Sequence, residues 1–117
     1  MIDIDSIDNV YIVSGVTDLR KGIDGYAHIV QDSLKLDPFS KSIFIFCNRQ
    51  HNKIKVLTYD INGFWLMYKR LDKSTFKWIK ESENGSVAIS KRQLRWLFEG
   101  LDIDQKRAFK NSETKYV

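Results

Sequence analysis

The residues of this sequence whose types and spacing suggest chemistry are mainly cations, and they fall in two segments. In the first segment, TDLRKGIDG (17–25), Arg20 and Lys21 occupy the expected first turn of a helix, with Thr17 as its N-cap. Free backbone N–H groups and the positive end of the helix dipole favour an anion at such a turn. The second segment contributes Arg49, Lys53, Lys55 and Arg70. Phosphate is the anion that this pattern favours.

The basic charge is concentrated in the middle of the chain, although the 117 residues carry a net charge of only +4. Residues 1–48 contain four Lys or Arg against seven Asp or Glu, whereas residues 49–80 contain eight against two. Residues 81–117 are nearly balanced, with seven against six. Such an asymmetry favours contact with a phosphate backbone. Lysines that serve only solubility are the alternative explanation.

Two glycines, Gly22 and Gly25, fall within this expected helix, where glycine costs about 1 kcal/mol relative to alanine. In one interpretation, a strand or a second helix approaches the helix closely at the glycines. In the other, the glycines let a phosphate backbone approach the neighbouring cations. Asp18 and Asp24 argue against a free anion site, because each can pair with a neighbouring cation.

Catalysis has little support in the sequence. Two-metal phosphoryl transfer needs several carboxylates at one site, and the spacing of the candidate carboxylates does not suggest such a site. These candidates are Asp18, Asp24, Asp37 and Asp60. His28 and His51 have no cysteine at ligand spacing, and the GIDG segment lacks the spacing of a phosphate-binding P-loop. We therefore expect no enzymatic activity, no metal and no cofactor.

Composition favours one cytoplasmic domain over residues 1–117. Forty-three per cent of the residues are hydrophobic, yet no apolar run approaches the length of about 20 residues that a membrane helix needs. The acidic N-terminus MIDIDSIDN is unlike a signal peptide, whose first residues are basic. Cys47, the single cysteine, lies in the apolar run SIFIFC and is expected to be a buried small hydrophobe.

Periodicity predicts an α+β domain with a mostly antiparallel β-meander of about five strands, one helix before it and one after it. The expected helices cover 18–34 and 91–99, the second with Ser90 and Gln93 in the spacing of a capping box and Gly100 at its end. Residues 103–117 are expected to fray. The candidate strands are 10–14, 42–47, 54–60, 64–71, 76–80 and 86–89, the last two joined through Asn84-Gly85.

Asn62-Gly63 predicts a tight hairpin turn with Ile61 opposite Phe64. That register pairs Tyr59 with Leu66, Leu57 with Tyr68, Lys55 with Arg70 and Lys53 with Asp72. Like charges directly opposed on one face destabilise a sheet unless an anion neutralises them. Lys55 and Arg70 beside Tyr68 would therefore suit a nucleic acid. In the alternative, the two cations splay apart into solvent. Lys69 points to the opposite face in this register.

Several segments occur in an order that resembles a known family. They are TDLRKGIDG (17–25), DPF (37–39), Asn48-Arg49 at a strand end, the run from Ile54 to Gly63, Lys69-Arg70-Leu71, Phe76 with Trp78, and 94–101. Together they resemble the TnpB accessory proteins of the insertion-sequence-sixty-six family of bacterial mobile elements. The loop 49–52 departs from the family pattern of several arginines followed by Gly-Asp. The resemblance implies a helper of transposition encoded beside a separate transposase.

The sequence thus favours a non-catalytic accessory factor in transposition that binds nucleic acid through a basic hairpin. The expected partners are the DNA of the element ends and the transposase of the same element, with no membrane contact, and the homo-oligomeric state is left open. The alternative is a protein-interaction module that docks on the transposase without touching DNA. The residues predicted to bind nucleic acid are Arg20, Lys21, Arg49, Lys53, Lys55, Tyr68 and Arg70.

Overall fold

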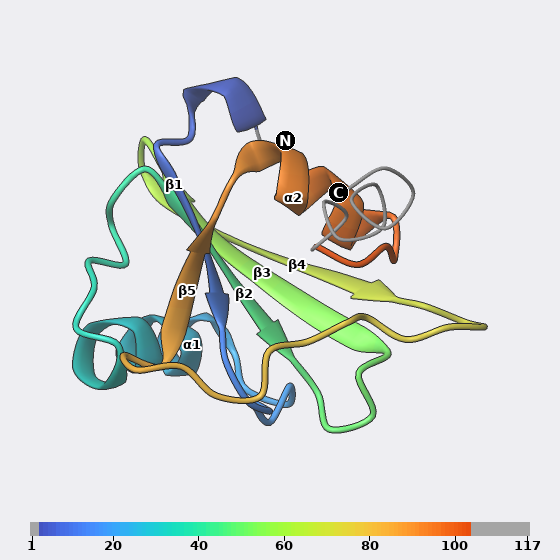
Figure 1. Cartoon of the computed structure of the whole chain (residues 1–117). Helices are drawn as coiled ribbons and strands as arrows, with labels where there is room; N and C mark the ends of the chain where they lie inside the picture. Colours follow the sequence, from blue (N-terminus) through green and yellow to red (C-terminus); the bar gives the residue numbers. More distant parts are fainter. Residues whose placement is uncertain (1–2, 104–117) are drawn as a thin grey trace.

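The computed structural model describes residues 3–103, and its five strands form one sheet in the order β4-β3-β2-β1-β5 (Figure 1). The strands are β1 (Asn9–Val13), β2 (Ser42–Cys47), β3 (Lys53–Asp60), β4 (Gly63–Arg70) and β5 (Ser86–Ile89). β1 and β2 run parallel, whereas every other pair of neighbouring strands is antiparallel. The predicted α+β fold with a mostly antiparallel sheet is confirmed.

One helix packs on each face of the sheet. α1 (Ile23–His28) continues as a π-helical segment, Ile29–Ser33, and α2 (Lys91–Phe98) closes the other face. A short 3₁₀ turn, Ile4–Ser6, precedes β1. In residues 3–103, no helix is long and apolar enough to cross a membrane.

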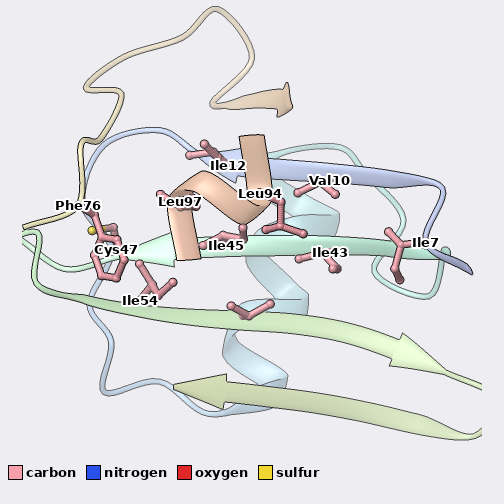
Figure 2. Close-up of a cluster of buried hydrophobic side chains, with 11 residues drawn as sticks. Ile7, Val10, Ile12, Ile43, Ile45, Cys47, Ile54, Phe76, Leu94 and Leu97 are labelled. Carbon is pink, nitrogen blue, oxygen red and sulfur yellow. The ribbon is translucent and has the colours of Figure 1, made fainter. Parts of the chain in front are cut away.

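β2 is the central strand of the sheet, and all six of its residues are buried between the two helices. Ile43, Ile45 and Cys47 point toward α2, into the cluster that Figure 2 shows, whereas Phe44 and Phe46 point toward α1. A strand buried on both faces is apolar without interruption, which explains the run SIFIFC. Burial raises the pKa of the Cys47 thiol to about 12, in keeping with the hydrophobic role expected of it.

The predicted strand 76–80 is wrong, because residues 74–82 form no regular secondary structure. Phe76 is instead buried in the α2 cluster, and the Trp78 Nε1 donates to the Val13 carbonyl at 2.9 Å. These aromatic side chains are held by packing and a side-chain bond rather than by a strand ladder. β5 consequently pairs with β1, and no hairpin joins it to residues 76–80.

The first helix begins later than predicted. Gly22 occupies the N-cap position with no side-chain cap, so Thr17 does not cap this helix. The Thr17 N–H instead donates to the Cys47 carbonyl at 2.8 Å, which ties the segment before α1 to the end of β2. The predicted end near residue 34 agrees with the end of the π-helical segment at Ser33.

No neighbouring strand or helix accounts for the two glycines of this region. A Cβ on Gly22 would meet no atom within 4 Å. A Cβ on Gly25 would lie 3.1 Å from the Lys21 Cβ, so its near neighbour is the chain that leads into α1. The interpretation that another element approaches closely at these glycines is therefore wrong.

The β3–β4 hairpin forms as predicted, but its register differs by two residues. Asp60 lies opposite Gly63, so the turn residues are Ile61 and Asn62, and Tyr59 lies opposite Phe64. This register stacks the Tyr59 and Phe64 rings edge to face with centroids 4.9 Å apart. A shift of two residues keeps every side chain on its predicted face. The local sequence therefore sets the face of each side chain, and the aromatic packing sets the partner.

The capping box of α2 is confirmed. The Gln93 N–H donates to the Ser90 Oγ at 3.0 Å, and the Ser90 N–H donates to the Gln93 Oε1 at 2.9 Å. Gly100 follows the helix with a φ of 77°. The tail predicted over residues 103–117 falls, apart from Ile103, outside the described residues.

Gly85→Ala is expected to destabilise the domain by about 1–2 kcal/mol. Gly85 has a φ of 81°, and a Cβ there would lie 3.0 Å from the Leu34 Cδ2. Gly63→Ala is the control, because a Cβ at that position meets nothing within 4 Å. Urea unfolding measures both variants, and equal free energies of unfolding for the two would contradict the left-handed turn at Gly85.

Candidate nucleic-acid interface

Three cations and one tyrosine share one end of the sheet on the α1 side. Lys53 and Lys55 lie two residues apart on β3, and Tyr68 and Arg70 lie two residues apart on β4. The register places Lys55 opposite Tyr68 and Lys53 opposite Arg70. Residues two apart along a strand share a face, so these four side chains lie on one side of the sheet. We call these four residues the cationic face.

The like-charge pair on this face differs from the predicted one. Lys53, rather than Lys55, lies opposite Arg70, and Asp72 pairs with Arg70 through a Nε–Oδ1 contact of 3.0 Å. The predicted Lys55–Arg70 and Lys53–Asp72 pairs are therefore wrong, for the two-residue register difference described above. Lys69 does point to the opposite face, where its ammonium group donates to the Phe98 carbonyl at the end of α2.

The segment between β1 and α1 borders the cationic face and forms an open groove with it. Residues from both sides line this groove: Asp18, Leu19, Arg20, Asn48, Lys53, Lys55, Leu66 and Tyr68. The Lys55 Nζ lies 3.4 Å from the Lys21 carbonyl oxygen and 5.8 Å from the centre of the Tyr26 ring. Arg49 lines an adjoining hollow together with Arg20. The fold thus brings together cations that are far apart in the sequence.

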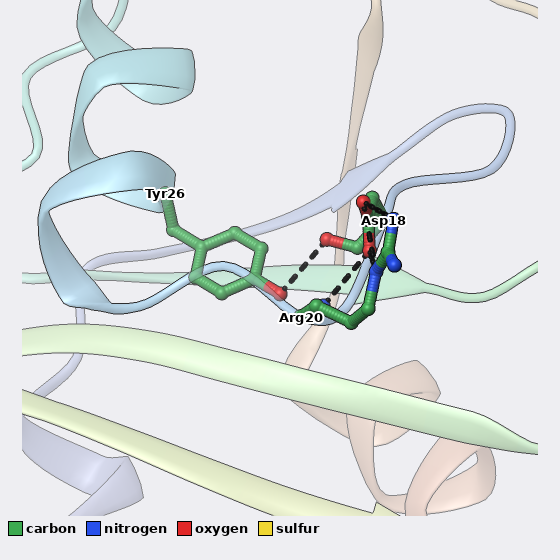
Figure 3. A network of polar contacts seen from close by, with 3 residues as sticks. All are labelled: Asp18, Arg20 and Tyr26. Atoms are coloured by element: carbon green, nitrogen blue, oxygen red, sulfur yellow. Dashed lines mark hydrogen bonds and ion pairs between the residues drawn. The ribbon is translucent and has the colours of Figure 1, made fainter.

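Arg20 is held by its neighbour Asp18, as Figure 3 shows. The guanidinium donates from Nη2 to Asp18 Oδ2 at 2.9 Å and from Nε to Oδ1 at 3.0 Å. These hydrogen bonds hold the pKa of the Asp18 carboxyl well below its usual range. Because α1 begins at Ile23, Arg20 and Lys21 precede the helix. The prediction that they occupy its first turn is wrong.

Two positioning contacts of the groove were not predicted from the sequence. The Tyr26 hydroxyl donates to the Asp18 carbonyl at 3.2 Å and so ties the Arg20 segment to α1 (Figure 3). The Asn48 Oδ1 accepts from the Asn52 and Lys53 N–H groups at 3.1 and 3.0 Å. An asparagine directly after a strand is a typical residue for such side-chain turns. The sequence did not indicate a polar contact of the Tyr26 hydroxyl, because Tyr26 fits the apolar stripe of the helix.

Several cations near the groove have no carboxylate partner. Within residues 3–103 the ion pairs are Arg20–Asp18, His28–Asp32 and Arg70–Asp72. No acidic side chain in that part of the chain pairs with Lys21, Arg49, Lys53 or Lys55. The same residues contain no group of three His, Cys, Asp or Glu side chains placed to hold a metal ion. The groove therefore carries a positive charge that its own acidic residues do not cancel.

Comparison with known proteins identifies the family of this small α+β domain. The model of the family described as IS66 Orf2 like protein matches residues 8–108. Uncharacterized protein y4hO of Sinorhizobium fredii (strain NBRC 101917 / NGR234) is 41% identical over 93 residues, which cover 80% of each chain. Uncharacterized protein y4jC of the same strain is 25% identical over 93 residues, covering 80% of this chain and 79% of y4jC. No solved structure matches the chain.

The chain belongs to the IS66 Orf2-like family, which confirms the resemblance seen in the sequence. Membership of this family implies a role in IS66 transposition.

The free energy of unfolding is expected to fall as the pH rises from about 10 to about 12. Burial raises the pKa of Tyr26 from 10.0 to about 12, so the unfolded chain loses this proton at a lower pH than the folded chain. This contribution is complete below pH 10 and is lost as the pH rises through the folded pKa. Urea unfolding at several pH values measures it.

Tyr26→Phe should make this decline shallower, because the variant has no hydroxyl at this position to lose a proton. The burial of Cys47 adds a decline of its own in both proteins. An identical pH dependence in the wild-type protein and Tyr26→Phe would contradict a raised pKa of Tyr26.

Proposed function

We propose that this chain is a non-catalytic accessory factor of IS66 transposition that binds the DNA of the element ends through the groove beside the cationic face. The observation that carries the proposal is the gathering of Lys53, Lys55 and Arg70 beside the exposed ring of Tyr68. Arg20 borders the same groove. Phosphates neutralised by such cations release counterions, which makes binding favourable at low salt.

Tyr68 gives the groove a second means of contact with nucleic acid. Its ring stands between cations on an exposed face, with Arg70 two residues along β4 and Lys55 directly opposite on β3. An aromatic ring beside a basic track is the arrangement with which proteins stack the bases of single strands. We therefore infer that opened or frayed element ends bind more tightly than closed duplex.

Docking on the transposase is the second candidate function, and a different surface supports it. Ile61, Phe39 and Trp65 are 96%, 58% and 46% exposed and line a hollow at the β3–β4 turn. Exposed large apolar side chains of this kind are typical of protein interfaces. This surface lies at the far end of β3 from Lys53, so DNA binding and transposase docking would use opposite ends of the sheet.

The double variant Lys53→Ala, Lys55→Ala is expected to weaken DNA binding about tenfold or more at low salt. It should also reduce the slope of log affinity against log salt, by about 1.8 for duplex DNA and about 1.4 for single strands, since each lost phosphate contact removes about 0.9 or about 0.7. Fluorescence anisotropy with duplex and single-stranded element ends measures both quantities. Thermal melting checks that the variant is folded.

The matched control is the double variant Lys69→Ala, Lys77→Ala, which removes the same charge from outside the groove. Lys69 points to the α2 face, and Lys77 is exposed in the β4–β5 connection. Equal losses in the two double variants would mean that DNA responds only to net charge, which contradicts a defined interface.

Ile61→Asn tests the second candidate. Ile61 has a φ of 43°, a conformation in which asparagine is more favourable than isoleucine, so the variant should keep its stability. If this surface docks on the transposase, the variant should lose co-purification with the transposase from nuclease-treated lysate while Lys53→Ala, Lys55→Ala keeps it. Undiminished co-purification of Ile61→Asn would count against docking at the turn.

A further inference from the structure

β4 is an edge strand, and no strand within residues 3–103 pairs with its outer side. In a two-residue hairpin, Asp60 and Gly63 form a hydrogen-bonded pair, and such pairs alternate along the ladder. Counting outward from Asp60 and Gly63, Asn52 and Leu71 should also form a hydrogen-bonded pair, and the Leu71 N–H does donate to the Asn52 carbonyl at 2.8 Å. The residues whose backbone groups point away from β3 are therefore Phe64, Leu66, Tyr68 and Arg70.

Over Gly63–Tyr68, this edge lacks the devices that usually prevent strand pairing. The eight β3–β4 pairs run without a bulge, and β4 contains no proline. Within residues 3–103, no turn, loop or cap backbone hydrogen bond reaches the outward-facing groups of β4. Natural proteins block such edges with bulges, prolines, charges or a covering element. Here charge is confined to the last two positions, Lys69 and Arg70.

We propose that β4 pairs antiparallel with β4 of a second copy of this chain, about a two-fold axis that passes through the sheet at Leu66. Such an axis keeps the α1 face of both copies on one side, so opposed residues must come from the same face. Leu66 then lies opposite the second copy's Leu66, and Phe64 lies opposite the second copy's Tyr68. On the α2 face, Trp65 lies opposite the second copy's Met67.

The distribution of charge favours this register over others. With the axis at Leu66, Lys69 lies opposite the second copy's Gly63 and Arg70 lies opposite its Asn62, so both cations lie beside turn residues at the ends of the paired strands. An axis at Met67 would place Lys69 opposite Trp65 and Arg70 opposite Phe64. A parallel pairing would bring Lys69 and Arg70 of the two copies together, where like charges are destabilising.

A second copy therefore fits this edge through both its backbone and its side chains. The outward N–H and C=O groups of Phe64, Leu66 and Tyr68 all gain partners, and the five strands of each copy join in one continuous sheet. Both cationic faces would then lie on the same side of that sheet. The pairing itself does not depend on whether those faces bind DNA.

A disulfide tests the register directly. Residues opposed in a hydrogen-bonded antiparallel pair have Cα atoms about 5.5 Å apart, which suits a disulfide. Leu66→Cys should form a covalent dimer under mild oxidation. Trp65→Cys is the control, because Trp65 lies opposite Met67 and not opposite its own copy. Free thiols, including the buried Cys47 once it unfolds, are alkylated before the denaturing gel.

Sedimentation equilibrium tests the use of the edge. The wild-type protein at high micromolar concentration should have twice the chain mass of 13.8 kDa. Tyr68→Pro removes an outward N–H without removing a bond to β3, so it should be monomeric with an unchanged circular dichroism spectrum. Tyr68→Ala keeps the N–H and should remain mainly dimeric.

A monomeric wild-type protein with no Leu66→Cys dimer would overturn the proposal. So would a dimer that cross-links through Trp65→Cys in preference to Leu66→Cys. If Tyr68→Pro fails to fold, the two cysteine variants still decide between these outcomes.

Discussion

The burial of β2 on both faces is the constraint on which the rest of the structure depends. Its six residues are inaccessible to solvent, with Ile43 and Ile45 against α2 and Phe44 and Phe46 against α1. Each such side chain contributes about 1.5–3 kcal/mol when it leaves water, and neither face can be left open. A helix must therefore cover each side of the sheet, and strands must flank β2 on both edges.

The cationic groove exists because the cover on one of these faces is short. α1 and its π-helical continuation pack over Phe44, Phe46 and the buried part of β3, while Lys53 and Lys55 at the start of β3 remain accessible in the groove. The chain that leads from β1 into α1 passes this end of the sheet and is tied to β2 through Thr17. The groove is thus a consequence of the same packing that forms the core.

The sequence predicted the features that depend on residues close together along the chain. It did not predict those that depend on contacts across the sheet. The apolar run of β2 and the capping box of α2 are local signals, and both were predicted correctly. The β3–β4 register was not, because a shift of two residues leaves the pattern of faces unchanged and the Tyr59–Phe64 contact decides it. The aromatic residues of 76–80 look like a strand, yet Phe76 and Trp78 are held by partners distant in sequence.

The site was predicted in part for the same reason. The alternation of side chains along a strand predicted that Lys53, Lys55, Tyr68 and Arg70 share one face. The hydrogen bond from the Tyr26 hydroxyl to the Asp18 carbonyl could be seen only in the folded structure.

The most direct test of DNA binding in the groove is a titration of the ¹⁵N-labelled protein with single-stranded element-end DNA, followed by amide chemical shifts. If DNA binds in the groove, the shifts concentrate on residues 18–21, 48–55 and 68–70. Shifts confined to the β3–β4 turn, or no shifts at low salt, would contradict it.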